Sequence, residues 1–157
     1  MTSVSATTRR PRPGEEDGRE YHFLDERRFR EAVASGEFLE WVHYSGDSYG
    51  TLRSDVEGKL AAGDDVILEI ELQGARAVRK ALPEAVSVFV APPSMAELAE
   101  RLRGRGTESD EAVARRLATA ETEMAAAREF DHVVVNDDAA RAAEQVAAII
   151  RQRRKGT

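Results

Sequence analysis

The chain has 157 residues, of which 41% are apolar and 33% are charged, so it is long enough for one globular domain with a buried core. It has no cysteine, no secretory pattern at its start and no apolar run near the roughly 20 residues of a membrane span, which excludes disulfides and thiolate chemistry and predicts a cytoplasmic protein. The net charge of −6 argues against broad nucleic-acid binding.

The first half of the chain is expected to form short strands and two helices. Asp25 is a good N-cap, and glycines at positions 36 and 63 stop the two helical patterns. A loop rich in proline, glycine and charge covers residues 10–19, and residues 45–48 are expected to form a turn. The expected strands are residues 2–8, 21–23 and 38–44, and the expected helices are residues 25–35 and 53–62.

The second half alternates apolar segments with helical patterns. Buried strands separated by helices favour an α/β fold with a parallel sheet covered on both faces. Ligands of such sheets gather beyond the carboxyl ends of the strands, so polar residues there are candidates for a site. The expected buried strands are residues 66–72, 86–90 and 132–135, and the expected helices are residues 74–81, 94–103 (with a capping box from Ser94 and Glu97), 109–130 and 138–154.

Arginines cluster in the loop SATTRRPRPGE at residues 5–15. Two prolines keep Arg9, Arg10 and Arg12 off any helix face. Guanidinium forks on a stiff loop suit a phosphate group, because each fork makes paired, charge-assisted hydrogen bonds. A disordered basic tail is an equally good interpretation of the composition alone.

Glu40 lies between apolar residues in GEFLEW, residues 36–41. A buried carboxylate needs donors, and the edge of guanine offers two adjacent N–H groups. A nearby hydroxyl, from Thr51 or Ser5, could donate to the guanine oxygen. For Glu40 taken alone, a surface glutamate on an edge strand is the better interpretation.

Glu69 and Glu71 interrupt the apolar segment 66–72. At spacing i, i+2 in a strand they would point to one face, near the carboxyl end of the strand. Two charges there are costly without a metal, an arginine or a polar ligand, so we favour a functional role over idle surface charge.

Glycines and arginines alternate in ERLRGRGT, residues 100–107, and Arg115 and Arg116 follow on the next predicted helix. A joint of this kind can act as a lid that brings cations to a transferring phosphoryl group. A helical hairpin with a solvated turn is as good an interpretation of this segment alone.

Two further patterns carry less weight. GDSYG at residues 46–50 matches the G-x-S-x-G nucleophile elbow, and Asp131 and His132 follow in a permissible order. Little chain precedes Ser48 for the strands and oxyanion loop that such a hydrolase needs. The histidines at 22, 43 and 132 lack metal-ligand spacing and are expected to be structural.

Taken together, several segments resemble the guanylate kinase family, which transfers the γ-phosphoryl group of ATP to GMP. Each segment alone is a weak signal, but they run in the family's order along essentially the whole chain. They are SVSATTR and PRPGE (residues 3–9 and 11–15), GREY (18–21), GEFLEW (36–41), YGT (49–51), LEIELQGA (68–75), PPS (92–94), GRGT (104–107) and VNDD (135–138).

The resemblance implies roles for individual residues. Where the family usually has aspartate, this chain has Glu71, whose extra methylene makes that assignment less secure. The implied GMP-phosphate ligands are Arg9, Arg12, Tyr21 and Tyr49, and the implied guanine readers are Ser5, Glu40, Thr51 and Glu71. The implied catalytic arginines of the lid are Arg101, Arg105 and Arg116, with Glu69 near metal and phosphates and Asn136 on the adenine side.

The resemblance also implies a single domain with the P-loop NTPase-like, parallel-sheet core of the nucleoside monophosphate kinases. Residues 5–52 would form a small α+β GMP-binding region, residues 53–93 and 131–157 the core, and residues 94–130 the helical lid and its flanking helices. The implied substrates are GMP or dGMP and ATP, and the implied cofactor is Mg²⁺ bound with ATP. No nucleic acid or membrane is expected as a partner.

One motif of the family has no counterpart in these 157 residues. The family begins with a strand leading into G-x-x-x-x-G-K-[ST], whose backbone N–H groups and lysine hold the ATP phosphates. We therefore expect an N-terminally shortened chain that binds GMP with little or no catalysis, because phosphoryl transfer depends on positioning and charge neutralisation. Loss of a central strand would also expose a sheet edge and reduce stability.

A non-enzymatic role is the second hypothesis. Guanylate-kinase-like modules of scaffold proteins bind phosphorylated peptides through the nucleotide site. In that case Arg9, Arg12, Tyr21 and Tyr49 would hold a phosphate group on a partner protein. The retained guanine readers and lid arginines favour the nucleotide.

Overall fold

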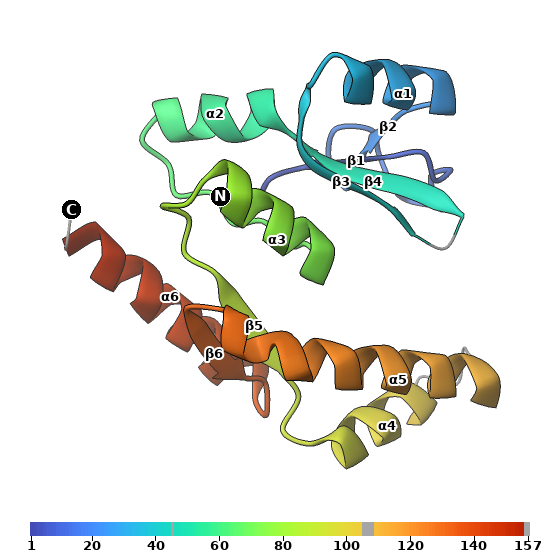
Figure 1. The fold of residues 1–157 in the computed structure, drawn as a ribbon, viewed down its shortest axis with the longest axis vertical. Helices are drawn as coiled ribbons and strands as arrows, with labels where there is room; N and C mark the ends of the chain where they lie inside the picture. The colour runs from blue at the N-terminus through green and yellow to red at the C-terminus, as the bar shows by residue number, and fades with distance from the viewer. Residues whose placement is uncertain (45, 105–108, 156–157) are drawn as a thin grey trace. The chain divides into compact units, whose positions relative to one another are not determined.

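The computed structural model describes residues 1–44, 46–104 and 109–155. The chain forms two compact units, Met1–Ala85 (unit 1) and Val86–Thr157 (unit 2), each with its own strands and helices (Figure 1). The division into a GMP-binding region, a core and a lid within a single domain remains a prediction.

Unit 1 contains a four-stranded sheet in the order β2-β1-β4-β3. Strand β1 runs parallel to β2 and antiparallel to β4, and β3 and β4 form an antiparallel hairpin. The strands expected at the start of the chain, at residues 21–23 and at residues 38–44 are confirmed. The strands are β1 (Ser5–Thr7), β2 (His22–Phe23), β3 (Phe38–Tyr44) and β4 (Asp47–Leu52).

Strand β4 lies where a turn leading into a helix was expected. Its central Gly50 weakens the strand pattern in the sequence, since glycine has no side chain to pack. In the structure that position requires glycine, because a Cβ atom there would lie 2.8 Å from the ring of Phe38. Packing against the neighbouring strand therefore decides the conformation of β4.

The three helices of unit 1 are α1 (Glu26–Ala34), α2 (Arg53–Ala61) and α3 (Leu72–Ala81). The Asp25 side chain accepts a hydrogen bond from the backbone N–H of Arg28 over 2.7 Å, which is the predicted N-cap of α1. Gly36 follows that helix with a φ of +71°, a conformation that favours glycine. The expected positions of α1 and α2 are thus confirmed.

Helices cover both faces of this sheet (Figure 1). On one face, Phe29 of α1 packs against Phe38 with 4.5 Å between the ring centroids. On the other face, Leu39 packs with Val56 of α2 and Val78 of α3. Phe38 and Leu39 are neighbours in β3, so this one strand contributes to both cores.

The prediction of a buried strand at residues 66–72 is wrong. Ile67 forms a single parallel bridge with Thr2, and α3 already begins at Leu72. Within the described residues, the segment pairs only with the first residues of the chain, which is too little for a ladder. Glu71 then ends the extended stretch by capping α3, so Glu69 and Glu71 do not share one face of a strand.

Unit 2 contains β5 (Val88–Ala91) and β6 (His132–Val135), which pair in parallel as expected. These strands are less buried than predicted, since Val90 and Val133 are 53% and 52% exposed. In the described part of unit 2 each strand has one strand neighbour, which leaves its other edge uncovered. The helices, close to their expected positions, are α4 (Met95–Gly104), α5 (Asp110–Ala126), the short 3₁₀ helix η1 (Ala127–Glu129) and α6 (Ala139–Lys155).

The capping box predicted for α4 is half formed. Ser94 Oγ accepts a hydrogen bond from the Glu97 N–H over 3.1 Å, but the Glu97 carboxylate pairs with Arg101 one turn further on. Across the described residues, no helix has both the length and the apolar character to cross a bilayer.

Candidate functional site

A buried carboxylate and a buried hydroxyl form a pair between β3 and β4. Glu40 is 6% exposed, Thr51 is fully buried, and Thr51 Oγ1 donates to Glu40 Oε1 over 2.6 Å. The register of the β3–β4 ladder shifts between Phe38 and Glu40, and beyond the shift Glu40 is paired with Thr51. The interpretation of Glu40 as a surface glutamate is therefore wrong.

The N-terminus of α3 lies directly against the Glu40 carboxylate. A Cβ atom on Gly74 would lie 2.8 Å from Glu40 Oε2, so any residue larger than glycine would displace this carboxylate. The Glu71 side chain caps the same helix and accepts from the N–H groups of Gln73 and Gly74 over 3.0 and 2.6 Å. Glu71 thus has a structural contact besides its predicted role in reading guanine.

The electrostatics around Glu40 favour a ligand that donates hydrogen bonds. Burial raises the pKa of Glu40 above its ordinary value, the hydrogen bond from Thr51 opposes this, and the negative charge of Glu71 raises the pKa further. An ionised carboxylate in this position is under-solvated. Two donors placed beside it would therefore be bound strongly.

Three of the four predicted guanine readers form a row across the sheet. Ser5 on β1 is the register partner of Thr51 on β4, and Thr51 is the register partner of Glu40 on β3. Register partners point to the same face of a sheet, so the three side chains lie side by side. The structure thus brings together residues that are far apart in the sequence.

The arginine loop folds back on Glu15. Arg9 Nη2 donates to both carboxylate oxygens of Glu15 over 2.9 and 3.0 Å, and the backbone N–H of Arg12 donates to Glu15 Oε2 over 2.7 Å. The hydrogen bond from Arg9 lowers the pKa of Glu15, and the one from the Arg12 backbone adds to this. The loop therefore has a defined conformation, which contradicts the interpretation as a disordered tail.

Three of the predicted phosphate ligands lie next to one another. The guanidinium carbon of Arg9 is 5.3 Å from the ring centroid of Tyr21, and the Tyr21 and Tyr49 rings meet edge to face at 6.2 Å. The fourth, Arg12, has its backbone held by Glu15 and its side chain exposed. Cationic forks and phenol groups in one place can bind a phosphate group.

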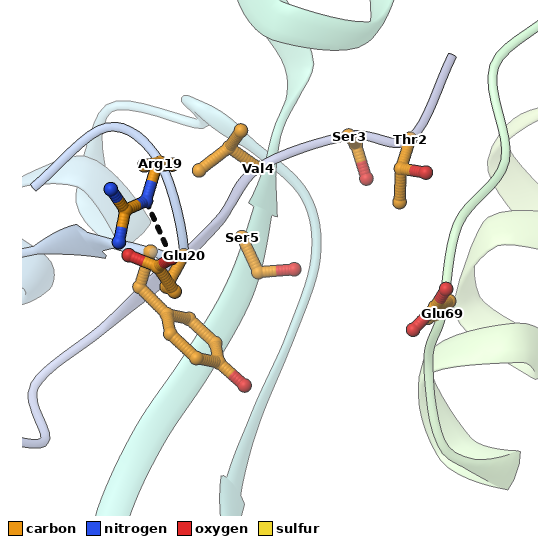
Figure 2. A pocket seen from close by; sticks show the side chains of 8 residues that line it. Thr2, Ser3, Val4, Ser5, Arg19, Glu20 and Glu69 are labelled. Carbon is orange, nitrogen blue, oxygen red and sulfur yellow. Dashed lines mark hydrogen bonds and ion pairs between the residues drawn. The ribbon is translucent and has the colours of Figure 1, made fainter. Parts of the chain in front are cut away.

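A hollow of about 250 Å³ opens beside β1. Figure 2 shows the Ser5 hydroxyl and the Glu69 carboxylate directed toward the space between them. The hollow therefore lies next to Ser5, a predicted guanine reader, and next to Tyr21, a predicted phosphate ligand. Its lining residues are Thr2, Ser3, Val4, Ser5, Arg19, Glu20, Tyr21 and Glu69.

In unit 2 the structure brings two further predicted site residues together. Arg101 Nη1 on α4 donates to the backbone carbonyl of Asn136 over 3.0 Å, and Arg101 also pairs with Glu97. Arg116 lies exposed on α5. Arg105 falls outside the described residues.

Two residues of the site were missed in the sequence. Glu15 was seen only as part of a motif, although it organises both Arg9 and Arg12. A signal for it exists in the sequence, since a turn at Pro13 and Gly14 brings a carboxylate back toward the arginines. Gly74 has no such signal, because its need for glycine depends on the distant Glu40.

The hydrolase pattern does not form a nucleophile elbow. Ser48 lies within β4, in an antiparallel hairpin, and not on a turn from a strand to a helix. Its hydroxyl lies 3.2 Å from Nδ1 of His43 on the facing strand. Asp131 accepts hydrogen bonds from the N–H and hydroxyl groups of Ser87. Both contacts join neighbouring segments and have a structural role.

Comparison with known proteins decides the family. A family profile described as "Guanylate kinase" matches residues 1–153. The chain is 57% identical over 150 residues to the guanylate kinase of Rubrobacter xylanophilus, and the aligned region covers 96% of this chain and 78% of that relative. It is 51% identical over 149 residues to the guanylate kinase of Dechloromonas aromatica, covering 95% of this chain and 74% of the relative. The chain belongs to the guanylate kinase family.

A solved structure agrees with this assignment. The crystal structure of guanylate kinase from Anaplasma phagocytophilum is 34% identical and has a TM-score of 0.80, covering 97% of this chain and 74% of that one. The predicted fold class, that of a nucleoside monophosphate kinase, is confirmed. Guanylate kinases are phosphotransferases, so the chain is a member of an enzyme family.

Proposed function

We propose that unit 1 binds GMP as the phosphoryl acceptor of an ATP-dependent guanylate kinase, in purine nucleotide metabolism. The observation that carries the proposal is the buried Glu40 carboxylate beside Thr51 and the N-terminus of α3. A charge buried at this cost is retained where a ligand supplies its hydrogen-bond donors.

Guanine has the complementary set of groups. Its ring N–H and its amino group are adjacent donors that one carboxylate can accept together, and its oxygen can accept from a hydroxyl. Glu40 would bind the two donors while Thr51 donates to its Oε1, and Ser5 would donate to the guanine oxygen. Glu71 would act on guanine from the N-terminus of α3, where its carboxylate already lies.

The phosphate group of GMP would bind at the arginine loop. Arg9 and Arg12 would neutralise its charge, and the Tyr21 and Tyr49 hydroxyls would donate to its oxygens. Glu15 would hold Arg9 in place, since it already occupies one nitrogen of the guanidinium fork.

In the reaction, an oxygen of the GMP phosphate attacks the γ-phosphorus of ATP in line with the departing oxygen. One O–P bond forms, the bond to ADP breaks, and the products are GDP and ADP. Arg101, Arg105 and Arg116 would stabilise the charge on the transferred group, with Asn136 on the adenine side and Glu69 near the phosphates.

Mg²⁺ would bind together with ATP, held by the nucleotide's phosphates. Within the described ranges, no group of three or more histidine, aspartate or glutamate side chains is placed to hold a metal ion. In nucleotide kinases Mg²⁺ bridges phosphate oxygens of the nucleotide, and Glu69 is the side chain of this chain that would lie near it.

Calorimetry with GMP and AMP tests the proposal on the 157-residue chain. Adenine lacks the two adjacent donors, so we expect AMP to bind at least about 100-fold more weakly than GMP. Equal binding of both nucleotides, or binding of neither, would contradict the proposal. ATP-dependent GDP formation, measured in a coupled assay, tests the transfer step separately.

A phosphopeptide module would give a different result. Its phosphate would use the same arginines but not Glu40, so phosphopeptide binding would be indifferent to Glu40→Ala and would not discriminate between purines. We expect instead that binding depends on Glu40 and discriminates between purines, because a carboxylate such as Glu40 cannot donate to a phosphate group.

Gly74→Ala is expected to weaken GMP binding by about tenfold. The new Cβ atom would meet Glu40 Oε2 at 2.8 Å and displace the carboxylate from the position in which it accepts guanine. Gly58→Ala is the matched control, because Gly58 lies inside α2 with open space around it. The control should keep GMP affinity and gain about 0.5–1 kcal/mol of stability from helix propensity. Equal GMP affinity in both variants would refute the role of Gly74.

A further inference from the structure

Thr7 lies at the centre of the predicted phosphate-binding end of unit 1. It is the last residue of β1, it is fully buried, and its register partners are Phe23 on β2 and Tyr49 on β4. Arg9 follows two residues later. Thr7 therefore pairs with β4, which carries Tyr49, and with β2, which directly follows Tyr21, but it is itself fully buried.

The Thr7 hydroxyl makes two hydrogen bonds that point in different directions. It donates to the backbone carbonyl of Ser48 over 3.0 Å and accepts from the backbone N–H of Arg9 over 3.1 Å. A buried hydroxyl with both a donor and an acceptor contact is held in one orientation. It joins the start of the arginine loop to the residue just before Tyr49.

Thr8 adds a second connection between the same two segments. The Thr8 N–H donates to the Ser48 carbonyl over 3.0 Å, and the Ser48 N–H donates to Thr8 Oγ1 over 2.8 Å. On the other side of β1, the N–H of Leu24 donates to the Thr7 carbonyl over 2.9 Å. These bonds set the register between Arg9, which follows Thr8, and Tyr49, which follows Ser48.

We propose that Thr7, assisted by Thr8, is a positioning residue for phosphate recognition: its hydroxyl fixes the backbone of Arg9 relative to Tyr49. This inference rests on the proposed function, because it concerns the same GMP site. The reason is geometric. Arg9 must present its fork at the distance at which the Tyr49 hydroxyl reaches the same phosphate, and a bidentate contact tolerates little displacement.

Thr7→Val tests the proposal, since valine has nearly the same shape and lacks only the hydroxyl. The measurement is the affinity of the 157-residue chain for GMP and for guanosine, which has the same base without the phosphate. We expect Thr7→Val to weaken the affinity for GMP by about tenfold and to change the affinity for guanosine by less than about twofold. Thr7→Ser keeps the hydroxyl and should retain the wild-type ratio of the two affinities.

The outcomes separate this proposal from others. Equal losses for GMP and guanosine, or no loss for either, would overturn it, because a general structural role does not distinguish the two ligands. If Thr7→Val does not fold, Thr8→Val, at a half-buried position, decides by the same ratio. A wild-type chain that binds neither GMP nor guanosine would refute the proposed function and this inference with it, whereas normal wild-type binding with equal losses in Thr7→Val would refute the inference alone.

Discussion

Replacing Glu40 by glutamine is expected to weaken GMP binding by about 100-fold or more and, at the same time, to stabilise the unliganded chain. In glutamine an amide N–H₂ replaces one carboxylate oxygen and faces the donors of guanine. Two charge-assisted hydrogen bonds are lost, each worth about 1.5–3 kcal/mol, and about 1.4 kcal/mol corresponds to a factor of ten. The glutamine oxygen can still accept from Thr51.

The gain in stability follows from the direction in which the pKa of Glu40 is shifted in the folded chain. Burial raises it in the folded chain above its value in the unfolded chain. Between the two pKa values the folded state binds more protons, so the contribution of Glu40 to stability falls as pH rises through the folded pKa. At pH 7 the ionised Glu40 therefore costs stability, and Glu40→Gln removes that cost.

Thermal unfolding and calorimetry across pH test both halves of this prediction. We expect the midpoint of Glu40→Gln to lie above that of wild type at pH 7, because burial raises the pKa of Glu40 in the folded chain. The difference should shrink as pH falls toward the raised pKa of Glu40. GMP affinity should fall more steeply for wild type than for the variant over the same range, because both chains share the loss that follows protonation of the GMP phosphate at about pH 6. A lower midpoint for the variant at pH 7 would contradict the argument.

Local signals were sufficient for the helices and for most strands. The Asp25 cap and the glycines after α1 and α2 act within a few residues of the chain, so the sequence shows them directly. The signals for the arginine loop are also local, since its prolines, its glycine and Glu15 lie within residues 9–15, but the composition alone left a disordered tail as an equally good interpretation.

Contacts between distant segments decided what could not be predicted. The apolar segment 66–72 has the composition of a buried strand, but a strand needs a partner, and Ile67 pairs only with Thr2. The burial of Glu40 depends on Thr51 and Gly74, which come from other elements. The resemblance to guanylate kinases implies a role in reading guanine for Glu40, whereas its own neighbours in sequence favour an exposed position.

The largest effect on the phosphate end is expected from Arg9→Lys. Lysine keeps the charge but replaces a planar fork by a single ammonium group, which cannot bind Glu15 and a phosphate in the same geometry. It also loses the stacking of the guanidinium on Tyr21. We expect GMP affinity to fall by about 10- to 100-fold with guanosine affinity unchanged, as measured by calorimetry.

Two controls show whether the fork of Arg9, and not basic charge in general, binds the phosphate. Arg10→Lys changes the exposed neighbouring arginine, whose carbonyl alone contacts Arg9, and should leave GMP affinity at the wild-type value. Glu15→Gln should weaken GMP affinity when it is the only substitution. In the double variant with Arg9→Lys it should add little further loss of affinity, because Glu15 acts through Arg9. Additive losses in the double variant would show that Glu15 acts independently, for example through Arg12, whose N–H it also accepts. Equal losses for Arg9→Lys and Arg10→Lys would mean that net charge alone attracts the nucleotide.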